Sequence, residues 1–137
     1  MVAEKKYIKN DTSVFGVYAG MYLLNQFGLT TQVPNKVEIV TNHETTRKRQ
    51  VTIEGRAFIL RKARCVITKE NAPVYTILQL FYEMDDSEQL SSFSRKQISN
   101  YIENNGISAE DLLSMSECFP AATLKKMVRS KVIYGTL

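Results

Sequence analysis

The side chains best suited to act on a partner are basic, and they are concentrated in one segment. Between positions 47 and 69 the sequence holds eight basic residues and a single acid, Glu54, whereas the rest of the chain is slightly acidic. A local excess of positive charge is typical of contact with an anionic partner such as DNA or RNA. The candidate nucleic-acid-binding residues of this segment are Arg47, Lys48, Arg49, Arg56, Arg61, Lys62 and Arg64.

The spacing of these cations leaves a second interpretation open. Side chains alternate between the two faces of a strand, so Arg47 and Arg49 would share one face with Val51 while Lys48 would lie on the other. The cluster therefore need not form one patch. The alternative is a set of lysines and arginines on the solvent-facing side of a sheet.

A second group of cations lies near the C-terminus. Residues 108–132 can be arranged as a short helix, a turn at 117–120 and a second helix, which is the layout of a helix-turn-helix. We interpret this region as a structural subdomain, with a DNA-reading helix as the alternative. The candidate nucleic-acid-binding residues of the second helix are Lys125, Lys126 and Arg129.

Residues for catalysis or metal binding are sparse. The only histidine, His43, falls in a polar loop without an obvious orienting partner, and Cys65 and Cys118 lack the paired spacing of metal or redox motifs. We expect two reduced, buried thiols, no metal, no cofactor and no catalytic residue. An enzyme with a site around His43 and residues 83–88 is the least favoured alternative, because the acids there lack EF-hand spacing; they are Glu83, Asp85, Asp86 and Glu88.

The pattern of apolar residues predicts an α+β fold. Residues 14–27 are apolar nearly all round and predict a buried helix that ends at Gly28, and alternation predicts short strands at 36–41, 49–53 and 57–62, with 65–67 as a possible fourth. We expect these strands to form an antiparallel meander. A helix over 70 or 71 to 83 would cover the sheet, and three short helices would follow at 94–104, 108–115 and 121–131.

Length and composition indicate an ordinary globular protein. The chain has 137 residues with 44% hydrophobic and 23% charged residues, which suits one α+β body over 1–86 and a small helical subdomain over 87–137. No apolar run reaches the roughly 20 residues that a membrane span needs. The N-terminus lacks the apolar stretch of a secretory signal, so we expect a cytoplasmic protein. The sequence leaves its oligomeric state open.

Several stretches of the sequence resemble one bacterial family. Residues 17–35 (VYAGMYLLNQFGLTTQVPN) and 37–42 (VEIVTN) resemble the core motif of AbiEi-like antitoxins and related transcriptional regulators, in which a small-residue helix leads into a turn and then a strand. Residues 67–72 (ITKENA) and 119–124 (FPAATL) are also similar to that family. The most specific part is residues 28–35.

This resemblance implies a regulatory, non-catalytic role. Family members typically carry an N-terminal winged helix-turn-helix ahead of this region, and act as antitoxin and as repressor of their own operon. The cognate toxin is nucleotidyltransferase-like, and in this type IV grouping the two proteins need not form a stable complex. The chain begins shortly before the body, so we expect the winged helix to be missing and any DNA contact to fall on the basic strands or the last helix. The alternative is a stand-alone nucleic-acid-binding protein.

Overall fold

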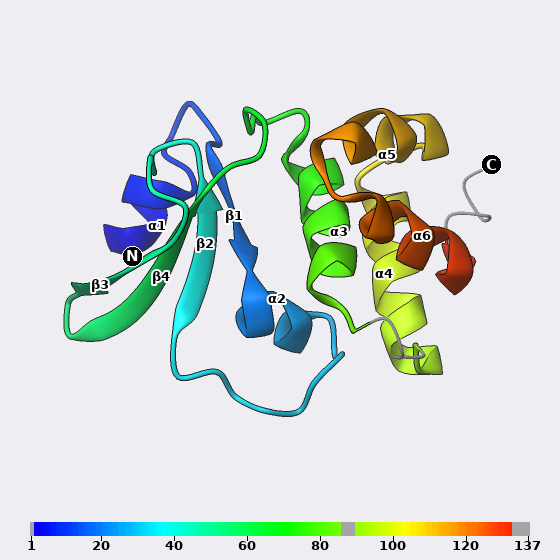
Figure 1. The fold of residues 1–137 in the computed structure, drawn as a ribbon, viewed down its shortest axis with the longest axis horizontal. Helices are drawn as coiled ribbons and strands as arrows, with labels where there is room; N and C mark the ends of the chain where they lie inside the picture. Colours follow the sequence, from blue (N-terminus) through cyan, green and yellow to red (C-terminus); the bar gives the residue numbers. More distant parts are fainter. Residues whose placement is uncertain (1, 86–89, 133–137) are drawn as a thin grey trace.

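The computed structural model describes residues 2–85 and 90–132, and it shows an α+β fold. A four-stranded sheet lies to one side of helix α3, and the remaining C-terminal helices pack on its other side (Figure 1). The strands are β1 (Gly16–Ala19), β2 (Val37–Thr41), β3 (Arg49–Ile53) and β4 (Arg56–Lys62). The helices are α1 (Val2–Tyr7), α2 (Gly20–Gln26), α3 (Ala72–Glu83), α4 (Ser92–Asn104), α5 (Ala109–Met115), the 3-10 turn η1 (Ser116–Cys118) and α6 (Ala121–Ser130).

The sheet has the order β1-β2-β4-β3, so the predicted antiparallel meander is wrong. The predicted strands themselves are confirmed, but β4 inserts between β2 and β3 and runs parallel to β2. Burial explains this order. Strand β4 carries the fully buried Phe58 and Leu60, whereas β3 exposes Arg49, Gln50 and Thr52 and therefore suits the edge of the sheet.

Residues 14–27 do not form the single helix that their apolar pattern predicted. The first part is strand β1, which pairs antiparallel with β2, and only Gly20 to Gln26 are helical. The chain turns from strand to helix at Gly20, whose φ of +61° favours glycine. The predicted stop is confirmed, because Gly28 has a φ of +75° and the amide of Leu29 donates to the carbonyl of Leu24.

The segment 65–67 is not a strand, contrary to the prediction of a possible fourth strand there. The side-chain amide of Asn42 replaces a strand neighbour, since it donates to the carbonyl oxygen of Ile67 at 2.8 Å and accepts from its amide at 2.9 Å. Helix α3 and the three helices after it are confirmed, and a capping box between Ser108 and Asp111 begins α5. No helix among the described residues is long and apolar enough to cross a membrane.

Two apolar clusters cover the two faces of the sheet. The smaller one packs α1 against residues of β2 and β4, including Ile39 and Phe58. The larger one surrounds α3 and joins β1 and α2 to side chains of α4, α5 and α6, including Ile98, Leu112 and Met127. The apolar packing therefore runs through both of the predicted subdomains. Their predicted boundary, between residues 86 and 87, lies outside the described residues.

Candidate nucleic-acid interface

A cavity of about 750 Å³ opens between the C-terminal half of β4 and helix α3. Its inner wall is α3, which contributes side chains at the spacing of one helical face. Its outer wall is the end of β4 with the loop before β3. The lining residues are Val40, Thr45, Arg47, Lys48, Arg61, Lys62, Ala63, Arg64, Tyr75, Gln79, Tyr82 and Glu83, and we call this cavity the basic cleft.

An ion-pair network involving Arg61 lies at the junction of the sheet and α3. The Arg61 guanidinium pairs with the carboxylate of Glu38 on β2, and its Nη1 lies 3.4 Å from Oε2 of Glu83 at the end of α3. Burial alone would lower the pKa of Arg61, but the two carboxylates outweigh it and hold that pKa above its usual value. The charge of Arg61 is thus already matched within the protein.

Glu83 also ties this network to the start of α2. Its Oε2 accepts a hydrogen bond from the backbone amide of Gly20, and the side-chain amide of Gln79 donates to the same oxygen at 3.2 Å. Strand β4, helix α3 and helix α2 therefore meet at the Glu83 carboxylate, and strand β2 joins them through the ion pair of Glu38 with Arg61. This arrangement fixes the distance between α3 and β4, and so the width of the basic cleft.

Four other cations line the basic cleft, and none of them forms a salt bridge with a described residue. Arg47 and Lys48 come from the loop between β2 and β3, Lys62 ends β4, and Arg64 follows it. All four side chains are exposed. We call these four residues the cleft cations, and their charge is free to act on a ligand.

The guanidinium group of Arg64 packs against two aromatic rings. Its guanidinium carbon lies 4.5 Å from the ring centroid of Tyr82 and 5.6 Å from that of Phe119. Its backbone amide donates to the hydroxyl of Tyr75 at 3.0 Å, which fixes the backbone beneath the side chain. Tyr75 is fully buried, and burial raises the pKa of its hydroxyl to about 12. Tyr75 is thus a core residue of α3, whereas Tyr82 is half-buried at the rim of the cleft.

The structure places Arg49 and Arg56 away from the basic cleft. Arg49 donates from Nε to the buried carboxylate of Glu44 at 2.7 Å, and this bond holds the pKa of Glu44 below its usual value. Arg56 begins β4 at the β3-β4 turn, opposite Ile53. The predicted cluster is therefore divided, with five of its residues at the cleft and two elsewhere.

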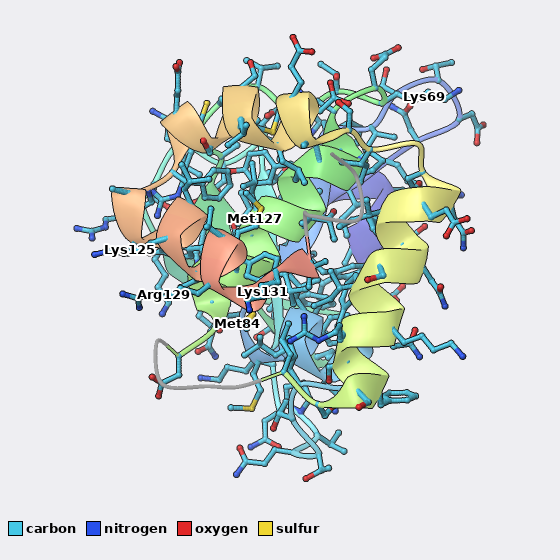
Figure 2. All side chains as sticks on the ribbon, turned by 90° about the vertical axis from the view of Figure 1, so that its right-hand side faces the viewer. Lys69, Met84, Lys125, Met127, Arg129 and Lys131 are labelled. Carbon is cyan, nitrogen blue, oxygen red and sulfur yellow. The ribbon has the colours of Figure 1, made fainter. Side chains whose placement is uncertain are left out.

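The cations of α6 also have different environments. Lys126 donates from Nζ to the carbonyl oxygens of Tyr82 at 3.3 Å and Met84 at 2.5 Å, and so binds the C-terminal end of α3. Lys125 and Arg129 are exposed on the outer side of the helix, while Met127 points into the core (Figure 2). Helix α6 is thus anchored to α3, with two of its predicted residues left accessible.

The other reactive side chains are accounted for by local contacts. His43 stacks on Phe15 with ring centroids 4.0 Å apart, and its Nδ1 lies 2.9 Å from the carbonyl oxygen of Lys6. The thiols of Cys65 and Cys118 are half-buried, and burial followed by a hydrogen bond with Cys118 raises the pKa of Cys65 to about 12. Among the described residues no three histidine, cysteine or acidic side chains are grouped to hold a metal. The predicted acids Asp86 and Glu88 lie outside the described residues.

Sequence reasoning missed the uncharged and acidic parts of the site. Glu38 lies in a predicted strand and Gln79 in a predicted helix, but nothing in their local patterns links them to Arg61 or to the cleft. Glu83 was correctly predicted as the last residue of the helix, but its contacts with Arg61 and Gly20 were not predicted. The only local signal was the alternation of β2, which places Glu38 on the face opposite Ile39.

Comparison of the chain with protein-family models, with curated proteins and with solved structures finds no match.

Proposed function

We propose that this chain is a nucleic-acid-binding body domain of the AbiEi-like antitoxin and regulator kind, which binds rather than catalyses. The observation that carries this proposal is the basic cleft, where four cations that form no salt bridge within residues 2–85 and 90–132 line one cavity. Concentrated positive charge in a concave site attracts anions, and the phosphate backbone of nucleic acid is the most abundant polyanion in a cell. The binding site is therefore the cleft and not the whole basic segment.

The construction of the cleft supports this proposal. Gathering four like charges is electrostatically unfavourable in the free protein, and binding phosphates would relieve it while releasing counterions. The ion pairs of Arg61 hold the wall in place without contributing free charge. Arginine also matches phosphate oxygens with two parallel donors, while lysine supplies a compact charge. The site thus has both kinds of phosphate ligand.

The resemblance to antitoxins connects this binding to a biological role. Its most specific part, residues 28–35, forms the connection between α2 and β2, immediately before the strand that carries Glu38. The motif that resembles the antitoxin family therefore directly precedes β2, whose Glu38 forms an ion pair with Arg61 at the wall of the cleft. We propose that the functional partner is a nucleotidyltransferase-like toxin and that neutralisation acts through nucleic acid, so no stable protein complex is needed.

We expect replacement of all four cleft cations with alanine to weaken nucleic-acid binding and its salt dependence. Each lost phosphate contact should flatten the plot of log affinity against log salt by about 0.9 on duplex DNA and about 0.7 on a single strand. Fluorescence anisotropy at several salt concentrations measures both. The fold should survive, because exposed changes away from caps and cores usually shift stability by within about 0.5 kcal/mol.

The matched control removes the same charge elsewhere. Four exposed cations outside the cleft, replaced together by alanine, should leave most of the salt slope in place; they are Lys36, Arg56, Lys69 and Lys96. If this control loses as much affinity as the cleft variant, only net charge matters and the cleft is not the site. If the wild type does not bind even at low salt, the proposed function is wrong.

We also expect a nucleotidyltransferase-like reading frame beside the gene, whose expression arrests growth. Co-expression of this chain should restore growth, and the variant that lacks the four cleft cations should fail to do so at equal protein levels. Colony counts on inducing plates measure the effect. The absence of such a neighbour, or rescue by the cleft variant as efficient as by the wild type, would contradict the antitoxin role of the cleft.

A further inference from the structure

The size of the basic cleft restricts what can enter it. A volume of about 750 Å³ falls within the range of roughly 300 to 1,000 Å³ that is typical of pockets for small ligands. A base pair inside a duplex is held between its stacked neighbours, and enzymes reach such a base only by extruding it. A duplex could therefore contact the rim of the cleft but could not fill it.

The wall of the cleft offers a surface on which a base can stack. The guanidinium of Arg64 covers the ring of Tyr82 at 4.5 Å while the residue as a whole remains exposed. Single-stranded bases stack on aromatic rings and on arginine planes of this kind. The hydrogen bond from the Arg64 amide to Tyr75 and the contact with Phe119 hold this platform in place. The interior bases of an intact duplex have no free face to place on such a platform, because each is stacked between its neighbours.

The other cleft cations lie around this platform, where they could contact the phosphates of a nucleic-acid strand on either side of the stacked base. Arg47 and Lys48 come from the loop before β3, whereas Lys62 is the last residue of β4, two positions before Arg64. On α3, Gln79 and Glu83 line the inner wall, where their hydrogen bond to each other and the ion pair of Glu83 with Arg61 hold that wall in place. Proteins that bind single strands combine these two features, which are cations that bind the phosphates and a flat surface on which a base stacks.

We propose that the basic cleft binds single-stranded nucleic acid by taking one unpaired nucleotide, with its base on the Arg64-Tyr82 platform and its neighbouring phosphates on Arg47, Lys48 and Lys62. The inference rests on the proposed function and names the form of nucleic acid that the site accepts. RNA and single-stranded DNA share this chemistry. The ligand is therefore defined by an unstacked base with flanking phosphates.

The experiment compares short oligonucleotides of one sequence as ribo and deoxy single strands and as a duplex, at the same salt concentration. Anisotropy gives the affinities, and 2-aminopurine at an interior position reports stacking. We expect the single strand to bind roughly fivefold or more tightly than the duplex, since stacking one base is worth about that factor or more. The 2-aminopurine emission should change on binding. A higher affinity for the ribo or for the deoxy strand would show whether the ligand is RNA or single-stranded DNA.

Arg64→Lys tests the platform without changing the charge. It should weaken single-strand binding by roughly fivefold or more while leaving the salt slope and duplex affinity unchanged, because lysine lacks the guanidinium plane. The matched control is Arg56→Lys, which lies outside the cleft and should have no effect. Circular dichroism checks that both variants fold.

The outcomes separate this inference from the proposed function. Equal binding of duplex and single strand, with unchanged 2-aminopurine emission, would overturn the inference and leave the proposed function standing. Full competition by a free nucleoside monophosphate at equimolar concentration would also overturn it, because the flanking phosphates would then contribute nothing. If no nucleic acid binds at low salt, the proposed function itself fails.

Discussion

Replacing Arg61 with methionine is expected to lower the free energy of unfolding by roughly 3 kcal/mol. The change leaves the carboxylates of Glu38 and Glu83 without their shared cation, and their side chains are only 17% and 10% exposed. Removing one partner of a buried ion pair typically costs about 3 to 5 kcal/mol, and we expect the lower end because Arg61 retains 21% exposure. Urea denaturation followed by circular dichroism measures the loss.

A triple variant provides the control for this prediction. Adding Glu38→Gln and Glu83→Gln to Arg61→Met removes both unpaired charges, so much of the lost stability should return. The triple variant should then be more stable than the single one, although fewer of its native groups remain. If Arg61→Met is as stable as the wild type, the ion pairs do not support the fold.

Gly20→Leu is expected to be the other strongly destabilising change, at about 2 to 5 kcal/mol. The φ of +61° at this position costs a residue with a side chain roughly 1 to 2 kcal/mol. A Cβ at Gly20 would also overlap the carboxyl group of Glu38, which Arg61 holds in place. Such crowding typically costs a further 1 to 3 kcal/mol, roughly. Thermal unfolding of the variant measures the sum.

Gly106→Leu separates the two causes. Gly106 has a φ of +62°, but no atom lies within 4 Å of the position that its Cβ would occupy. This variant should therefore show the backbone cost alone, and its melting temperature should fall less than that of Gly20→Leu. Equal losses would mean that Glu38 moves aside without cost and that the junction between β1 and α2 is not tightly packed.

The elements that the sequence predicts well are those whose signals are local. Helix α5 has a capping box within its first turn, and α3 has a stripe of apolar residues and a proline near its start, so the signals for both lie within the segments themselves. Residues 14–27 were misassigned because a segment that is apolar on all sides gives no periodicity to separate a buried strand from a buried helix. What makes β1 a strand is its pairing with β2, which lies in a different part of the chain.

The order of the sheet and half of the site depended on contacts between distant residues. The alternation of apolar residues correctly predicted β3 and β4 as consecutive antiparallel strands, but it carries no information about which of the two would lie beside β2. In the same way, the density of positive charge pointed to the segment that lines the cleft. It could not separate Arg61, which is paired with two carboxylates, from Lys62 and Arg64, which form no salt bridge with any residue that the structure describes.

The position of α3 restricts how this fold can change during evolution. Seven of its residues are buried, and the helix lies between the sheet with α2 and the three helices that follow it. Its C-terminal end is bound from both sides, by Gly20 and Arg61 through Glu83 and by Lys126 through the carbonyls of Tyr82 and Met84. Neither flank can therefore be exchanged for an unrelated module without exposing this helix. Recombination should preserve the two flanks together, and variation between homologues should concentrate in exposed turns such as residues 54–55 between β3 and β4.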